Sequence, residues 1–164
     1  DKEEARHLFS DLDWPGAVQE CCQAIEYLRG EGCSKVVAFG SCMGGALALA
    51  AGQHCNLDGA VSFYGTPSRR LAQPEHVKIP VQIHVGELDK HVGFSDLATV
   101  DRWISDLHSA GGSGVMYVYE ACGHAFLNSG DLAVELRKNI GHPEPTKAVQ
   151  ELAWERALEF IRSI

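Results

Sequence analysis

The sequence predicts an α/β fold with about four strands in a mostly parallel sheet, because short apolar runs alternate with longer stretches of helical pattern. The strand-like runs lie at 36–39, 57–64, 81–85 and 115–119. The helical stretches run from about 14 to 29, 43 to 53, 94 to 110 and 146 to 164. In the last stretch, the candidates for a buried stripe are Ala148, Leu152, Leu158 and Ile161.

Length and composition favour a single domain spanning 1–164. Of the 164 residues, 45% are hydrophobic and 22% are charged, which is ordinary for a globular domain with its own core. The sequence contains no internal repeat, low-complexity tract or linker-like stretch. The segment 66–80 is rich in proline and charge, and reads either as a cover over an active site or as a surface loop.

The charge balance argues against nucleic acid or an anionic membrane as a partner. The net charge is −8, whereas both partners require clustered lysine and arginine, and Arg69 and Arg70 are only an isolated pair. No apolar run approaches the roughly 20 residues that span a bilayer, and the acidic start shows no secretory signal. We therefore expect a cytoplasmic protein without a nucleic-acid or membrane partner.

Cysteine usage supports the same location. The chain has six cysteines, at positions 21, 22, 33, 42, 55 and 122. They fall in helices, at strand edges and in one sharp turn of a core-rich chain, which favours reduced thiols in a reducing compartment. There is no C-x-x-C pair, so neither a zinc ribbon nor a thioredoxin-type site is expected.

Residues 40–45, GSCMGG, directly follow the first strand-like run and lead into a small, helix-favouring stretch. This is the pattern of a nucleophile elbow, a sharp strand-to-helix turn with the nucleophile at its apex. Positions two before and two after the apex must be small, and Gly40 and Gly44 hold these positions around Cys42. Ser41 is excluded as the apex because its own flanking positions are large. The alternative is a non-catalytic glycine-rich turn with a buried apolar cysteine.

A thiol needs a base and an electropositive setting to react efficiently at neutral pH. Cys42 opens a helix, whose dipole favours the thiolate. The backbone amide of Met43 is expected to face the developing oxyanion.

The loops after the third and fourth strands offer the remaining groups of a triad. Asp89 ends the loop 86–89, and His124 lies in the loop 121–126; both loops reach the same sheet edge as the elbow. Asp89 is expected to orient the His124 imidazole, which exchanges a proton with Cys42 and the leaving group. The alternatives are an aspartate that caps a helix and a histidine that bonds a turn carbonyl.

Two other arrangements are weaker. A metal cluster of His84, Glu87, Asp89 and His91 is disfavoured, because side chains alternate between the faces of a strand and no second ligand group lies nearby. Cys122 is read as a packed structural thiol, with a reversible disulfide to Cys42 as the alternative.

On its motifs at 40–45, 86–89 and 123–126, the sequence resembles the dienelactone hydrolase (carboxymethylenebutenolidase) family from about residue 14 to the end. The resemblance implies an α/β hydrolase fold and cleavage of lactones or small activated esters through a thioester, without a cofactor. It also implies triad roles for Cys42, Asp89 and His124.

The sequence departs from this family in two ways. Family members carry four further strands before the elbow, so this chain is expected to be the carboxyl-terminal part of a longer protein. The absent strands supply the second oxyanion amide, a glutamate near the thiol and a substrate-binding arginine. The dienelactone enzymes also have an arginine four positions after the histidine, where this chain has Asn128, which weighs against dienelactone itself as the substrate.

The sequence thus predicts a cysteine-dependent hydrolase of small esters or lactones. The rivals are a non-catalytic subunit of α/β-hydrolase-like fold, which binds a partner, and a thiol redox sensor. A four-stranded sheet with one helix on its second face needs further cover. An amino-terminal segment, self-association or a partner chain is expected to provide it.

Overall fold

The computed structural model describes residues 4, 7 and 10–164, and it has a parallel sheet with the strand order β1-β2-β3-β4. The strands are β1 (Val37–Ser41), β2 (Gly59–Phe63), β3 (Val81–Gly86) and β4 (Gly114–Tyr119). Each strand begins and ends within two residues of the run predicted for it. The predicted α/β fold with parallel strands is confirmed.

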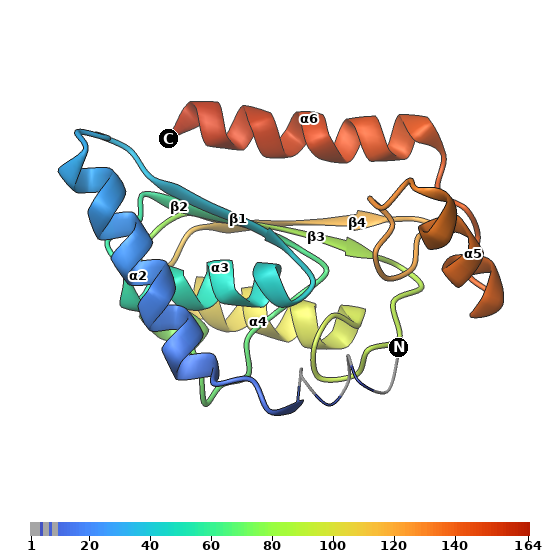
Figure 1. Cartoon of the computed structure of the whole chain (residues 1–164), viewed down its shortest axis with the longest axis horizontal. Coiled ribbons are helices and arrows are strands. Elements are labelled where there is room, and N and C mark those ends of the chain that lie inside the picture. The colour runs from blue at the N-terminus through green and yellow to red at the C-terminus, as the bar shows by residue number, and fades with distance from the viewer. Residues whose placement is uncertain (1–3, 5–6, 8–9) are drawn as a thin grey trace.

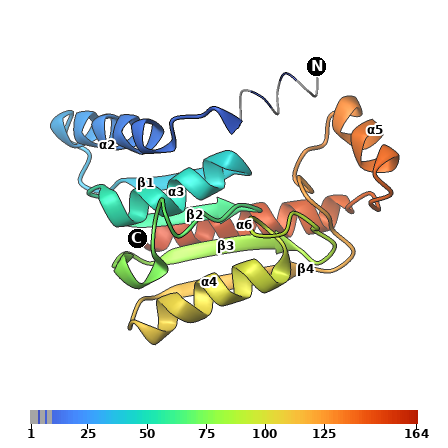
Figure 2. The same ribbon diagram turned by 90° about the horizontal axis from the view of Figure 1, so that it is seen from below.

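Helices cover both faces of the sheet (Figures 1 and 2). They are α2 (Trp14–Gly30), α3 (Met43–His54), α4 (Leu97–Ser109), α5 (Asp131–Asn139) and α6 (Lys147–Ser163), with a short 3-10 helix η1 (Pro74–His76). Helices α3 and α4 connect neighbouring parallel strands and lie on one face, as right-handed crossovers require. Helix α6 follows the last strand and lies on the other face. No helix among the described residues is long and apolar enough to cross a membrane.

The helix predicted from residue 94 begins three residues later, at Leu97. The Asp96 side chain accepts a hydrogen bond from the amide of Thr99 at 3.2 Å, which makes Asp96 the N-cap. Helix α5 was not predicted, because within its nine residues the helical spacing of apolar side chains extends only from Leu132 to Leu136, too short a pattern to distinguish a helix from a loop.

The central strands β2 and β3 are buried along their whole length. On the α6 side, Ala153 and Ala157 are fully buried against the sheet, while the predicted stripe residues Leu152 and Leu158 are exposed. The predicted stripe was therefore wrong at both leucines and at Ala148, which is also exposed, whereas Ile161 is partly buried against the same cluster. Alanine lets the helix axis approach the sheet closely, so the small residues and not the large ones face the core.

Strand β1 lies at one edge of the sheet, and apolar side chains near it are exposed. Phe39 of β1 stacks on Trp154 of α6, with ring centroids 5.3 Å apart, and both are partly open to solvent. The predicted cover of this edge by another segment or chain stays a prediction.

One disulfide overturns an expectation about the cysteines. Cys22 of α2 and Cys55, the residue after α3, are bonded, with their Cα atoms 5.0 Å apart. The prediction of six reduced thiols is thus wrong for this pair, because packing of α2 on α3 joins positions 33 residues apart in the sequence. The expected reducing compartment depended on reduced thiols, and the disulfide leaves it without support. The other four cysteines are free.

The core contains a polar network centred on His84 of β3. Its Nδ1 lies 2.8 Å from the Tyr119 hydroxyl, its Nε2 lies 2.8 Å from Gln82 Oε1, and its ring stacks on Phe63. Complete burial, and secondarily the charge of Arg156, lower the pKa of His84 to about 3. His84 is therefore a neutral structural residue of the core.

This burial predicts an acid-sensitive fold. The unfolded chain takes up a proton on His84 below its ordinary pKa of 6.5, but the folded chain does so only near pH 3. Stability is thus lost as the pH falls from 6.5 towards 3. We expect this histidine to lower the free energy of unfolding by about 2 kcal/mol between pH 7 and pH 4.5.

Urea unfolding of the wild type and of His84→Gln at the two pH values tests the expectation. Carboxylates titrate in both proteins, so the difference between the two pH dependences isolates His84. Equal pH dependences would mean that His84 is not buried in its neutral form.

Candidate active site

Cys42 lies at a strained turn between β1 and α3. Its φ of 52° is in the left-handed region that residues other than glycine seldom adopt. The Cys42 amide donates to the carbonyl of Phe63 on β2 at 2.9 Å, and the Cys42 carbonyl accepts from Gly45 and Ala46 in the first turn of α3. These hydrogen bonds hold the apex residue from both sides.

Two glycines allow this turn to be so tight. A Cβ on Gly40 would lie 2.1 Å from the carbonyl oxygen of Gly44, and one on Gly45 would lie 2.4 Å from Ser62 Oγ. The requirement predicted for Gly40 is confirmed, but the one predicted for Gly44 is wrong. Apart from its own helix backbone and its chain neighbours, no described atom lies within 4 Å of a Cβ built on Gly44, because that position points away from the sheet and Gly45 points towards it.

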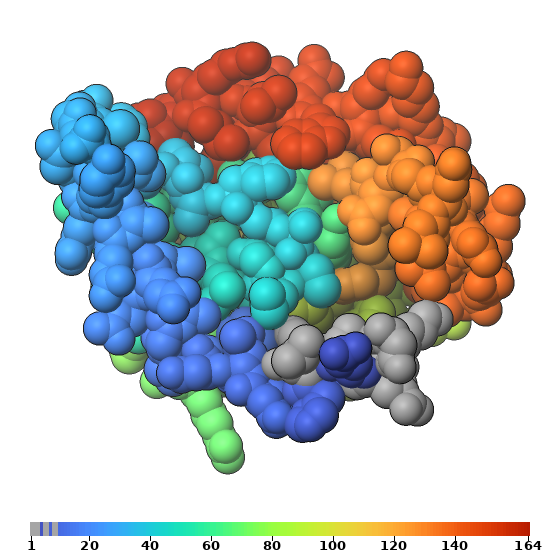
Figure 3. All heavy atoms as spheres, viewed as in Figure 1, coloured from blue at the N-terminus to red at the C-terminus, as the bar shows by residue number. Residues whose placement is uncertain are grey.

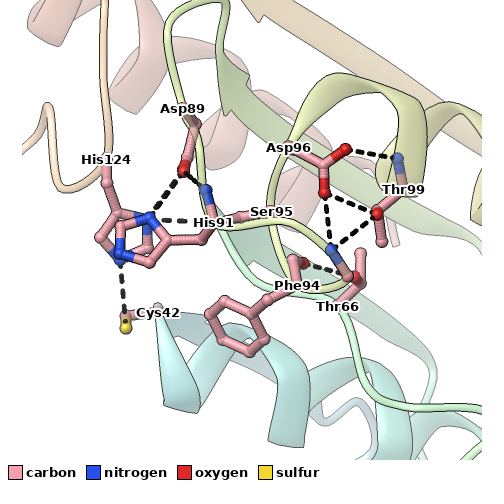
Figure 4. Close-up of polar contacts among 10 residues, drawn as sticks. Cys42, Thr66, Asp89, His91, Phe94, Ser95, Asp96, Thr99 and His124 are labelled. Atoms are coloured by element: carbon pink, nitrogen blue, oxygen red, sulfur yellow. Dashed lines mark hydrogen bonds and ion pairs between the residues drawn. The ribbon is translucent and has the colours of Figure 1, made fainter.

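The structure brings the side chains of Cys42, His124 and Asp89 into one hydrogen-bonded series (Figure 4). His124 Nε2 lies 3.3 Å from Cys42 Sγ, and His124 Nδ1 lies 2.7 Å from Asp89 Oδ2. The Asp89 side chain is completely buried, and that of His124 is 14% exposed. The imidazole is thus fixed between the thiol and the carboxylate, in reach of a molecule at the surface.

Backbone contacts join the loops that carry Asp89 and His124. The Leu88 amide donates to the Cys122 carbonyl at 2.8 Å, and the Ala121 amide donates to Glu87 Oε2 at 3.0 Å. A Cβ on Gly86 would lie 2.4 Å from the same Cys122 carbonyl, so the close approach of the two loops needs glycine there.

Arg137 of α5 anchors the other end of the His124 loop. Its Nη1 donates to the carbonyls of Ala125 and Asn128, at 3.2 and 2.6 Å, and its Nε and Nη2 donate to the two carboxylate oxygens of Glu144. Arg137 is 3% exposed. The guanidinium thus fixes the segment that follows His124, a role that the sequence does not reveal.

Three further residues lie against His124 or its partner Asp89. The sequence suggested His91 only as a metal ligand and did not single out the other two. The hydroxyl of the buried Ser95 lies 3.2 Å from His124 Nδ1. His91 Nδ1 lies 2.8 Å from Asp89 Oδ1, so that one carboxylate holds two imidazoles, whose ring centroids are 4.2 Å apart. Tyr64 packs edge-on against His124 at 5.1 Å. Only the position of His91 two residues after Asp89 gave any signal.

The charges of neighbouring groups in this series shift each other's pKa values. Burial acts to raise the pKa of the Cys42 thiol, but the hydrogen bond and charge of His124 and the Met43 amide outweigh it, and the pKa is lowered. Burial acts to lower the pKa of His124, yet hydrogen bonds and charges from Asp89 and Cys42 raise it to about 9. The pair therefore favours a thiolate beside an imidazolium at neutral pH.

The metal cluster considered from the sequence divides into residues that lie apart and a pair, Asp89 and His91, that stays together and is joined by His124. His84 bonds within the core and Glu87 bonds the Ala121 amide. Asp89, His91 and His124 do bring ligand atoms within 4.8 Å of one another. The hydrogen bonds that Asp89 accepts from both imidazoles account for this closeness, so the group needs no ion to hold it together.

The other thiol near the site is inaccessible. Cys122 is 1% exposed in the cluster with Tyr119 and Phe126, and burial raises its pKa. A buried thiol of raised pKa reacts poorly, which favours the structural role for Cys122.

The parallel sheet, its helices and the turn at Cys42 define a protein of the α/β hydrolase class. The family model of the dienelactone hydrolase family matches residues 1–164, and the chain belongs to that family. It is 31% identical to a carboxymethylenebutenolidase of Pseudomonas putida over 163 residues, covering 98% of this chain and 63% of the relative. It is 28% identical to a putative carboxymethylenebutenolidase of Saccharolobus solfataricus over 151 residues, covering 90% and 51%. The chain thus spans between about half and two thirds of the length of these relatives.

Solved structures share the fold. A dienelactone hydrolase-like promiscuous phosphotriesterase from metagenomic libraries superposes with a TM-score of 0.74 at 17% identity, covering 99% of this chain and 66% of that one. Thermogutta terrifontis esterase 2, phosphorylated by paraoxon, gives a TM-score of 0.60 at 20% identity, covering 83% and 68%. At these identities the likeness concerns the fold.

The space around the three glycines of the elbow predicts different effects of alanine substitution on stability. We expect Gly40→Ala and Gly45→Ala each to destabilise the fold by about 3 kcal/mol or more, because a methyl group collides with atoms that cannot move away. Gly44→Ala is the matched control and should keep or raise stability, by up to about 1 kcal/mol, since alanine favours helix. Chemical denaturation of the three variants provides the comparison; a loss in Gly44→Ala equal to the other two would contradict it.

Proposed function

We propose that the chain carries the reaction centre of a cysteine-dependent hydrolase of small esters or lactones. The observation that carries the proposal is the series of side chains Cys42, His124 and Asp89, with contacts of 3.3 and 2.7 Å, at a strained elbow. The names of the family, of the carboxymethylenebutenolidase relatives and of the esterase neighbours support the class of substrate.

In the first step, the Cys42 thiolate attacks the carbonyl carbon of the substrate and forms a C–S bond. The carbonyl electron pair moves onto oxygen, which accepts a hydrogen bond from the backbone amide of Met43. The tetrahedral intermediate then expels the alcohol oxygen, which takes the proton from His124 Nε2. The products of this step are a free alcohol, a thioester on Cys42 and a neutral imidazole.

In the second step, the neutral His124 takes a proton from water as the water oxygen attacks the thioester carbon. Collapse of this second intermediate breaks the C–S bond and releases the carboxylic acid. The thiolate and the imidazolium are restored. Throughout, Asp89 keeps Nδ1 protonated and directs Nε2 towards the sulfur, so it acts through His124.

Removal of the thiol tests the proposal. Cys42→Ala should lower kcat/KM for an activated ester such as phenyl acetate by at least about 10³-fold, because no other group in the site replaces the nucleophile. Cys42→Ser should be nearly as poor, since a hydroxyl needs a stronger base. Cys33→Ala, which removes an exposed free thiol, is the control and should be fully active. The comparison is made in the full-length protein, which includes the expected amino-terminal strands. Wild-type activity in Cys42→Ala would refute the nucleophile, and no turnover in the full-length wild type would favour the non-catalytic subunit.

The pH dependence tests the roles of His124 and Asp89. Acylation by esters of weakly acidic alcohols needs the protonated His124, so its rate should fall as the pH rises through about 9. In Asp89→Asn the groups that raise the pKa of His124 are weakened, and this basic limb should move to lower pH. The rate at neutral pH should also fall by about 10² to 10⁴-fold.

The measurement is kcat/KM against pH for both proteins. An unchanged basic limb together with a change in KM alone would assign Asp89 to binding or capping.

A further inference from the structure

A cavity of about 500 Å³ lies beside His124, outside the thiol series. Its wall includes His91, His124, Ala125 and the face of helix α5. In Figure 1 the strands β3 and β4 point towards α5, and in Figure 3 the orange atoms of this segment form one end of the molecule. The cavity thus lies beyond the carboxyl ends of these strands, on the side of the reaction centre.

The wall that α5 contributes is apolar and open to solvent. Leu132 and Leu136 of α5 and its C-cap residue Ile140 are spaced four residues apart, so they follow one side of the helix to its end. They are 69%, 37% and 55% exposed. An apolar row of this size at the mouth of a cavity marks a place where an apolar group is taken out of water.

Among the described residues that line the cavity, each cation already has partners. The His124 imidazolium faces Asp89 and Cys42. Arg137 is the one lysine or arginine among the described residues that line it, and its guanidinium already bonds Glu144 and the carbonyls of Ala125 and Asn128. Asn128, also in the wall, is neutral. A carboxylate placed here would lose water without gaining an ion pair.

The proton transfer to the leaving group indicates which part of a substrate reaches the cavity. His124 Nε2 faces Cys42 Sγ at 3.3 Å, so the alcohol oxygen must approach that nitrogen when it leaves. The group attached to this oxygen then extends past the imidazole, and the same imidazole lines the cavity.

From these four observations we propose that the cavity beside His124 binds an apolar alkyl or aryl leaving group, and that Leu132, Leu136 and Ile140 determine this preference. The inference rests on the proposed function and deepens it. It names the substrates as neutral esters whose alcohol part is apolar, in preference to esters with an anionic alcohol part.

Three acetate esters with nearly equally acidic phenols test the inference: phenyl acetate, meta-propylphenyl acetate and meta-(carboxymethyl)phenyl acetate. Their intrinsic reactivities are close, so kcat/KM reports binding of the substituent. In the wild type we expect the propyl ester to exceed the carboxymethyl ester by roughly tenfold or more, from partial burial of three carbon atoms.

Leu132→Lys and Ile140→Lys should each reduce this ratio at least about fivefold, because a cation replaces part of the apolar wall. Both side chains are largely exposed, so the fold should tolerate the changes, and having two variants guards against one that fails to fold. Leu152→Lys is the matched control, since it puts the same charge on an exposed leucine of α6 outside the cavity, and it should keep the wild-type ratio.

The possible outcomes distinguish failure of this inference from failure of the proposed hydrolase function. Turnover of all three esters with the same ratio in every variant overturns the leaving-group site alone. No turnover of any ester by the full-length protein with Cys42 intact overturns the proposed function, and this inference with it. A wild-type dimer that Leu132→Lys dissociates without changing the ratio would make the row on α5 a protein interface, and would also overturn the inference.

Discussion

The left-handed backbone of Cys42 depends on how closely strand β1, strand β2 and helix α3 approach one another. Gly40 and Gly45 have no room for a Cβ, and the Cys42 amide is fixed by Phe63 on β2. Because those contacts hold the turn from several directions, the unfavourable φ is retained and Sγ projects from the apex towards His124. The same turn starts α3 at the residue after the thiol, so the helix dipole and the Met43 amide act on the sulfur.

The second feature of the site is one buried carboxylate that holds two imidazoles. Asp89 accepts from His124 on one oxygen and lies 2.8 Å from His91 on the other. The carboxylate, the imidazolium and the thiolate alternate in charge along the series, which explains why the pKa of His124 rises and that of Cys42 falls despite their burial. The close approach of the two loops at Gly86 and the hydrogen bonds of Arg137 hold the segments that carry Asp89 and His124 in place. The pKa shifts of His124 and Cys42 therefore depend on how β3, β4 and α5 position these segments.

The sequence predicted what depends on local pattern and on the topology of parallel sheets. Strand runs and the elbow predicted the fold, and the rule that carboxyl ends of parallel strands meet at one edge predicted where Asp89 and His124 would lie. Features that depend on tertiary packing were not predictable. The Cys22–Cys55 disulfide needs the contact of α2 with α3, and the exchange of roles between Gly44 and Gly45 needs the helix orientation. Ser95 and Arg137 reach the site only through folded loops, so their spacing in the chain carries no signal.

The most direct test of this account is the pH dependence of Cys42 alkylation by iodoacetamide, followed by mass spectrometry of the peptide that contains it. In the wild type the rate should follow a thiol with a pKa below the ordinary value of 9, because the imidazolium of His124 stabilises the thiolate. In His124→Gln the alkylation midpoint should move to higher pH. A midpoint that is the same in both proteins, at or above 9, would contradict the thiolate–imidazolium pair on which the account rests.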